Sequence, residues 1–186
     1  AVAGQVYRWF DSAGTQVFQS ANNTVNTFTS GSLTASTTFS VAIVDGNGCE
    51  STRTTINVTV NPIPTAPTTT DNGRCNPGTV ILTANGATAG LVYRWRNSLG
   101  TIVKTSVDNN DNTFTTGSIA TTTTFTVSIF NSTTSCESTP VNVQAVISTT
   151  PTAPTATDVQ RCGNGTVIFT ATGAASDVNL RYRWYD

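Results

Sequence analysis

The chain has 186 residues, a net charge of −1 and neither His nor Met, and charged residues make up only 10% of it. Such a charge gives no basic field for nucleic acid and no polybasic patch for a membrane surface, so neither is expected as a partner. Thr accounts for about a fifth of the residues, and a chain rich in Thr and Val and poor in charge favours strands over helices. We therefore expect an all-β protein.

The sequence repeats with a period near 87 residues. Two cysteine contexts each occur twice at that spacing: Cys49 and Cys136 precede Glu-Ser, and Cys75 and Cys162 follow Arg. A Tyr-Arg-Trp block occurs three times, ending at Trp9, Trp95 and Trp184. This period is too long for a solenoid turn and suits a small domain that folds independently.

The phase of the repeat predicts the domain boundaries. We expect residues 1–61 to form the C-terminal part of one repeat, residues 62–148 a complete repeat, and residues 149–186 the N-terminal part of a third. On this interpretation the chain is a segment of a longer repetitive protein. The links at 61–64 and 148–151 contain proline, which restricts bending more than Gly/Ser linkers do.

Within the complete repeat, alternation of apolar and polar residues predicts strands over 79–84, 91–96, 124–129 and 141–147, with weaker strands at 101–106 and 112–115. About seven strands in fewer than 90 residues is a sandwich count. Alternation places Tyr93 and Trp95 on one face and Arg94 on the other. We expect Tyr93, Trp95, Phe125 and Val127 to form the core, and Arg94 to lie in a cross-strand ion pair or over a neighbouring strand.

The four cysteines could bind a metal or form disulfides. None is spaced as Cys-x-x-Cys and no His completes a zinc site, so a disulfide in an oxidising compartment is favoured. Because each repeat offers one Arg-Cys and one Cys-Glu-Ser, the predicted bond joins Cys75 to Cys136, and Cys49 and Cys162 would pair outside the chain. A Cys49 to Cys75 bond would use the same two motifs but would join adjacent repeats.

Two other candidate sites have simpler explanations. Tyr93 and Trp95 could stack on sugars, but the core is the preferred interpretation. The oxygen-rich stretch 108–112 could bind calcium, although its counterpart 22–26 has no carboxylate, which favours Asx turns.

Several motifs together resemble a known family. They are Arg-Cys-x-x-Gly-Thr-Val, Tyr-Arg-Trp-Tyr/Phe-Asp, Thr-Thr-Phe-x-Val, and Cys-Glu-Ser followed by a Pro-x-Pro-Thr-Ala-Pro link. The combination resembles the Ig-like repeat of giant surface proteins of Bacteroidetes, which are exported by the type IX secretion system and include gliding-motility adhesins of the SprB type. The resemblance implies tandem Ig-like or fibronectin III-like β-sandwich domains in an extended array.

Proteins of this phylum also share an Asp-Ser/Thr-apolar pattern for O-glycosylation. Asp11-Ser12-Ala13 matches this pattern, so the resemblance implies Ser12 as an acceptor, with a plain turn as the alternative.

The resemblance also implies a function. We expect an extracellular stalk at a bacterial cell surface, whose partners are neighbouring repeats, outer-membrane motility or secretion machinery, and an unknown surface ligand or glycan bound through a tip. The alternative is a glycan- or protein-binding accessory array of a secreted enzyme. With no His and no recognisable nucleophile, we expect no catalysis and no cofactor.

Overall fold

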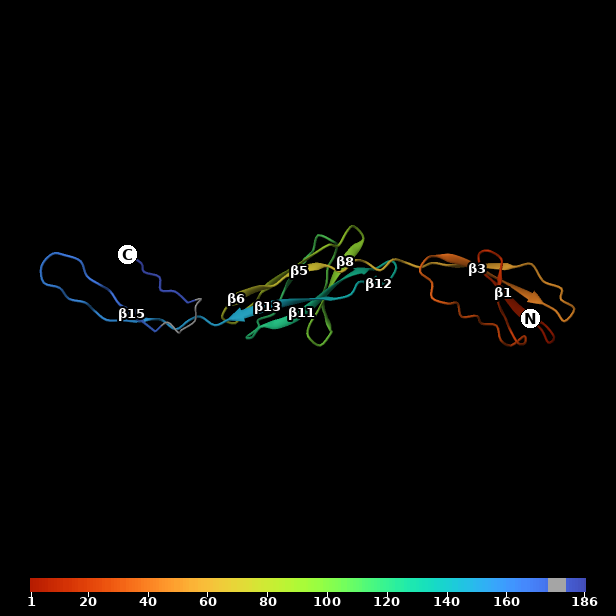
Figure 1. Ribbon diagram of the computed structural model, residues 1–186, viewed down its shortest axis with the longest axis horizontal. Helices are drawn as coiled ribbons and strands as arrows, with labels where there is room; N and C mark the ends of the chain where they lie inside the picture. Colours follow the sequence, from red (N-terminus) through yellow and green to blue (C-terminus); the bar gives the residue numbers. More distant parts are fainter. Residues whose placement is uncertain (174–179) are drawn as a thin grey trace. The chain divides into compact units, whose positions relative to one another are not determined.

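The structure is a computed structural model that describes residues 1–173 and 180–186 (Figure 1). All of its regular elements are strands, which confirms the prediction of an all-β protein. In the described part of the chain no helix is long and apolar enough to cross a membrane. The chain divides into two compact units, residues 1–64 with 133–136 and residues 65–132 with 137–186.

The first unit contains one antiparallel sheet. Its strands are β1 (Val6–Phe10), β2 (Gln16–Gln19), β3 (Thr37–Val44) and β4 (Thr54–Val58), in the order β2-β1-β3-β4. Phe28 lies against Trp9, Phe18 and Phe39, with ring centroids 5.6 to 5.7 Å apart. Trp9 remains half-buried, because no second sheet of this unit covers its face.

Residues 65–148 of the second unit form two sheets. The smaller is β10-β7-β5, built from β5 (Thr68–Thr70), β7 (Ile81–Asn85) and β10 (Thr113–Thr115). The larger has the order β6-β13-β11-β8-β9, with β12 paired to β11. Its strands are β6 (Asn72–Cys75), β8 (Leu91–Arg96), β9 (Ile102–Thr105), β11 (Thr123–Asn131), β12 (Cys136–Glu137) and β13 (Val141–Ser148).

The core of the second unit lies between these two sheets. Trp95 and Val127 are fully buried, and Tyr93 and Phe125 are 2% and 7% exposed. Phe114 of β10 stacks on Trp95 at a centroid distance of 5.6 Å and meets Phe125 edge-on at 5.3 Å. The Tyr93 hydroxyl accepts a hydrogen bond from the Ala87 backbone N–H at 3.0 Å, so its polar end is paired at the rim of the core.

Strand β6 is not predicted by the sequence pattern. It runs parallel to β13, with Cys75 opposite Ser148 and Gly73 opposite Val146. A Cβ atom at position 73 would lie 2.6 Å from the Val146 carbonyl oxygen, so glycine is what allows the two backbones to approach. Asn-Gly-Arg-Cys has no apolar alternation, which explains why pattern analysis misses this strand.

Beyond Ser148 the described residues form only two short strands, β14 (Thr155–Ala156) and β15 (Ala171–Thr172), which pair with each other. Trp184 is 60% exposed and belongs to no strand. Among the residues described beyond Ser148, no strand pairs with this Tyr-Arg-Trp block. Trp184 is therefore not buried as Trp95 is in its sheet.

Truncating Trp95 to Ala should lower the unfolding free energy of the second unit by about 3 to 5 kcal/mol, because it empties the space between the sheets. Urea denaturation followed by circular dichroism measures the loss. Trp95→Phe keeps an aromatic ring and removes an indole N–H that has no hydrogen-bond partner among the described residues, so it should cost clearly less. Equal losses for the two variants would contradict this packing.

Candidate functional site

A cluster of charged and polar side chains in the second unit surrounds Glu137 on β12. Its carboxylate lies 3.0 Å from Nη1 of Arg94 and 2.6 Å from Nη2 of Arg96, and it accepts a hydrogen bond from the Ser128 hydroxyl. The register of the sheet explains the assembly, because β11 pairs with β8 so that Ser128 lies opposite Arg94, and β12 pairs with β11. Three strands therefore supply one carboxylate and its donors.

An aromatic ring completes the cluster. The Arg94 guanidinium lies over the ring of Phe130, 3.4 Å from its centroid, a distance at which the ring face attracts a cation. Arg94 thus satisfies both predicted alternatives, since it forms a cross-strand ion pair and also lies over the neighbouring strand β11.

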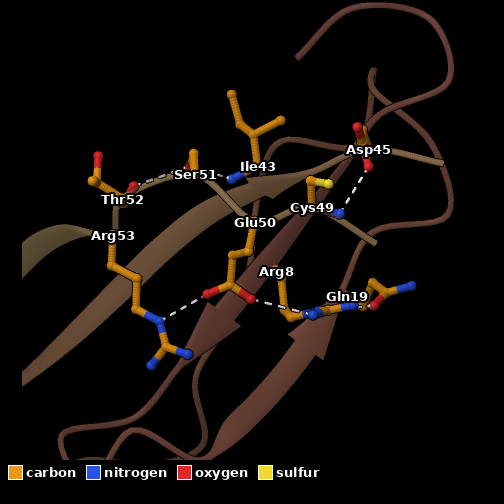
Figure 2. A network of polar contacts seen from close by, with 9 residues as sticks. All are labelled: Arg8, Gln19, Ile43, Asp45, Cys49, Glu50, Ser51, Thr52 and Arg53. Carbon is orange, nitrogen blue, oxygen red and sulfur yellow. Dashed lines mark hydrogen bonds and ion pairs between the residues drawn. The ribbon is translucent and has the colours of Figure 1, made fainter. Parts of the chain in front are cut away.

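The first unit contains the same kind of cluster around Glu50 (Figure 2). Glu50 lies 3.2 Å from Nη1 of Arg8 on β1 and 2.9 Å from Nε of Arg53. Arg53 lies over the ring of Phe10, 3.4 Å from its centroid. Both units therefore combine one glutamate, two guanidinium groups and one aromatic ring, and we call this arrangement the Arg–Glu brace.

The two braces use different residues for the second guanidinium. Counted along the Tyr-Arg-Trp block, Phe10 stands where the second unit has Arg96, and 87 residues after Arg53 stands Pro140. In the first unit the second guanidinium therefore comes from the segment after Glu50, and in the second unit it comes from β8. Both units therefore pair one glutamate with two arginines, although the second arginine comes from a different position in each repeat.

The contacts of the brace keep its glutamate ionised. Partial burial raises the pKa of Glu137, but the Ser128 and Arg96 hydrogen bonds and the charges of Arg96 and Arg94 outweigh it and hold the pKa below the ordinary value of 4.5. A carboxylate held ionised by several donors is a poor proton acceptor near neutral pH. The brace is not predicted from the sequence, although the 87-residue spacing of Glu50 and Glu137 is a signal that could have indicated it.

The Asp- and Asn-rich loops form Asx turns. Asp45 Oδ1 accepts hydrogen bonds from the backbone N–H groups of Asn47 and Cys49, and Asp108 Oδ1 accepts from those of Asn110 and Asp111. Among the residues that the structure describes, no group of three or more His, Cys, Asp or Glu side chains is placed to hold a metal ion.

The Asp111 carboxylate forms an ion pair with Lys104. One of its oxygens lies 2.6 Å from the Lys104 ammonium, and its other oxygen accepts from the Val107 N–H at 3.2 Å. The Lys104 hydrogen bond, followed by that from Val107, lowers the pKa of Asp111 below its ordinary value of 3.8. The loop is therefore organised by backbone donors and one lysine.

Ser12 lies at the turn between β1 and β2, where it is exposed. Asp11 Oδ1 accepts hydrogen bonds from the N–H groups of Ala13 and Thr15 at 3.0 and 2.8 Å, so the carboxylate before Ser12 shapes the turn. O-glycosylation of Ser12 stays a prediction.

The structure differs from the predicted Cys75 to Cys136 bond, since all four cysteines have free thiols. Cys75 lies opposite Ser148, at the end of β13. Cys136 pairs with β11 near the other end, where Val127 of β11 lies opposite Val141, and Figure 1 shows β6 and β12 at opposite ends of β13. Seven residues of strand separate these ends by about 23 Å, whereas a disulfide needs Cα atoms within about 7 Å.

A hollow in the second unit is lined by residues beyond Ser148, among them Pro151, Pro154, Tyr182 and Trp184. In the Tyr-Arg-Trp motif, Tyr182 and Trp184 occupy the positions of Tyr93 and Trp95, which are buried in the core. The aromatic residues that line the hollow therefore match core positions, which favours a packing face over a ligand site.

Comparison with known proteins identifies a family. The family model described as "Ig-like domain CHU_C associated" matches residues 1–62 and 64–148. A search of curated proteins finds no match.

Solved structures with a similar fold include the fibronectin(III)-like modules of CbhA from Clostridium thermocellum (14% identity, TM-score 0.46, 79% of each chain covered). They also include the BSP domain of a biofilm associated protein (17% identity, TM-score 0.33, 81% of this chain and 26% of that chain). A chimeric titin Z1Z2 tandem has 13% identity and a TM-score of 0.35, with 78% of this chain and 85% of that chain covered.

Replacing Glu137 with Gln should destabilise the second unit by about 1 to 3 kcal/mol, because it removes a charged acceptor and leaves Arg94 and Arg96 close together without their counter-ion. Thermal unfolding of the full chain measures the effect. The matched control is Glu50→Gln, which should affect the first unit and leave the second transition unchanged. A shift of the second transition by Glu50→Gln would contradict two separate braces.

The stability of the second unit should depend on acid in a defined direction. The folded-state pKa values of Glu137 and Asp111 are lowered, so protonation favours the unfolded chain. Their contribution to the free energy of unfolding is fully present above the unfolded-state pKa values of about 4. It is lost as the pH falls through the folded-state pKa values. Midpoints of thermal unfolding between pH 7 and pH 2 should stay level and then drop below about pH 4, with a smaller drop in Glu137→Gln.

Proposed function

The chain belongs to the family of CHU_C-associated Ig-like domains, and from this premise we propose that it is a force-transmitting segment of a stalk in a bacterial cell-surface adhesin. The family match at residues 1–62 and 64–148 supports a succession of similar domains. We further propose an extracellular location reached by type IX secretion, attachment to motility or secretion machinery, and a role in adhesion or gliding.

The main support for the proposal is that the two family-matched stretches share their stabilising contacts and differ in their surface loops. Both contain the Arg–Glu brace and an aromatic cluster in which a tryptophan meets a phenylalanine at 5.6 Å. The loops at 22–26 and 108–112 differ in sequence. Features that stabilise the domain therefore recur, whereas the surface loops that would contact a ligand do not, and this is the pattern of a repeated structural element.

A sugar-binding role finds little support in the complete repeat. Tyr93 and Trp95 are 2% and 0% exposed, so neither ring face is available for stacking on a glycan. Catalysis lacks support as well, because Glu137 is bound by two arginines and the sequence has no His. We therefore propose that the domains act by length and mechanical resistance.

The pairing of β6 with β13 gives the proposal a physical mechanism. The two strands are parallel, with partners from Asn72 opposite Ala145 to Cys75 opposite Ser148. Strand β6 lies near the beginning of the domain and β13 at its end, so tension applied to the two ends loads these backbone hydrogen bonds together. A ladder loaded in shear resists more force than one opened bond by bond.

Force spectroscopy on the full chain, pulled from its two ends, tests the proposal. The second unit should unfold in a resolved event, and Gly73→Ala should lower the unfolding force because its Cβ would collide with the Val146 carbonyl. Gly117→Ala is the matched control, since a Cβ there has no neighbour within 4 Å. Absence of a resolved event, or binding on a glycan array that substitutions in 108–112 abolish, would favour the accessory binding array instead.

A further inference from the structure

The repeat spacing and two contacts within the compact units locate the partners of the cysteines. Asn61 and Ser148 are 87 residues apart, as are Cys49 and Cys136. Asn61 and Ser148 therefore occupy the same position in successive repeats. Ser148 is the last residue of β13, and Asn61 lies three residues after the end of β4.

The cysteine of the Arg-Cys motif lies beside this position in its own repeat. Cys75 is opposite Ser148 in the parallel pairing of β6 and β13, and the Asn76 N–H donates to the Ser148 carbonyl at 2.8 Å. Asn76 has a left-handed backbone with φ 64°, which turns the chain directly after Cys75. The thiol is exposed.

The Arg-Cys-x-x-Gly motif holds this cysteine by local contacts. A Cβ on Gly78 would lie 2.2 Å from the Arg74 guanidinium, and a Cβ on Gly165 would lie 2.0 Å from that of Arg161. In both copies the arginine therefore folds over the glycine. The residue after the second cysteine, Gly163, again has positive φ at 71°, so the motif builds the same turn twice.

The cysteine of the Cys-Glu-Ser motif lies beside the same position of the preceding repeat. Residues 133–136 belong to the first compact unit together with residues 1–64, and the Cys136 Sγ lies 4.0 Å from the Asn61 carbonyl oxygen. Asn61 is where the Arg-Cys cysteine of that preceding repeat would lie, because it corresponds to Ser148. Both kinds of cysteine thus approach one backbone position from two successive repeats.

We infer that each disulfide of this repeat joins neighbouring repeats, with the Arg-Cys thiol of one bonded to the Cys-Glu-Ser thiol of the next. The partners are then 148 residues apart, since Cys75 would pair with the residue 87 positions after Cys136. No two cysteines of this chain have that spacing. The inference rests on the proposed function only in requiring a neighbouring repeat.

The reaction is ordinary thiol–disulfide exchange with an oxidant of the protein disulfide class. One cysteine thiolate attacks the oxidant's disulfide and forms a mixed disulfide, and the second thiolate displaces the oxidant's sulfur. Two thiols lose two protons and two electrons, and the oxidant's disulfide is reduced to a dithiol. The product covalently bridges the link between two domains and closes no loop inside either.

The test uses the full chain with one extra copy of residues 62–148 inserted after Ser148, produced in an oxidising compartment. Peptide mapping without reduction should find one disulfide, between Cys75 and the Cys136 of the inserted copy, with the other four of six thiols free. Cys75→Ser should abolish the bond and Cys49→Ser should leave it intact. A bond within one repeat, a Cys49 to Cys75 bond, or no bond in the folded protein would overturn the inference.

A second measurement needs no variant. The 186-residue chain treated with glutathione disulfide at high dilution should show no bond between any two of its cysteines, and a Cys75 to Cys136 bond would overturn the inference. Both experiments read bond connectivity and not force. A stalk that proves mechanically weak therefore leaves the pairing result intact, and a failed pairing leaves the stalk proposal to its own test.

Discussion

Packing of one tryptophan between two sheets is the interaction on which the second unit depends. Trp95 contacts Phe114 from the smaller sheet, and Phe114 meets Phe125 from the larger, so the stack joins β8, β10 and β11 across the core. Burial of rings of this size supplies much of the hydrophobic free energy available to a domain of fewer than 90 residues. With Trp95 facing inward, Arg94 and Arg96 face outward, and the same strand therefore places the brace.

The all-β class and the core residues follow from local sequence patterns and could be predicted from the sequence. Period-two alternation identifies β8, β11 and β13, and the inward face of β8 follows from Tyr93 and Trp95. Strand β6 was inaccessible because its pairing depends on a glycine that lets two backbones approach, and Asn-Gly-Arg-Cys has no alternation to reveal it. The pairing of β6 fixes the position of Cys75 beside the end of β13. Without that strand, counting motifs predicts a bond between two cysteines that lie at opposite ends of β13.

The brace was only partly accessible for a related reason. Repetition marks Glu50 and Glu137, and alternation puts Arg8 and Arg94 on the outer face. The second guanidinium does not occupy equivalent positions, because Arg53 supplies it in the first unit and Arg96 in the second. Comparison of the two repeats column by column shows an arginine lost and another gained, and only the structure shows that each of these arginines reaches the glutamate of its own unit.

This relocation also affects how reliably adjacent repeats fold. Similar neighbouring domains tend to exchange strands during folding. If β1 replaced β8 in the second unit, Glu137 would face Arg8 and Phe10 and would lose one guanidinium. If β8 replaced β1 in the first unit, Glu50 would face Arg94, Arg96 and Arg53, and Arg53 would lose the Phe10 ring. Each correct brace has two guanidinium groups for one carboxylate. The first exchange leaves one guanidinium group and the second gathers three, so the exchanged assemblies lose an ion pair or crowd like charges, and the brace discriminates a repeat's own strands from those of its neighbour.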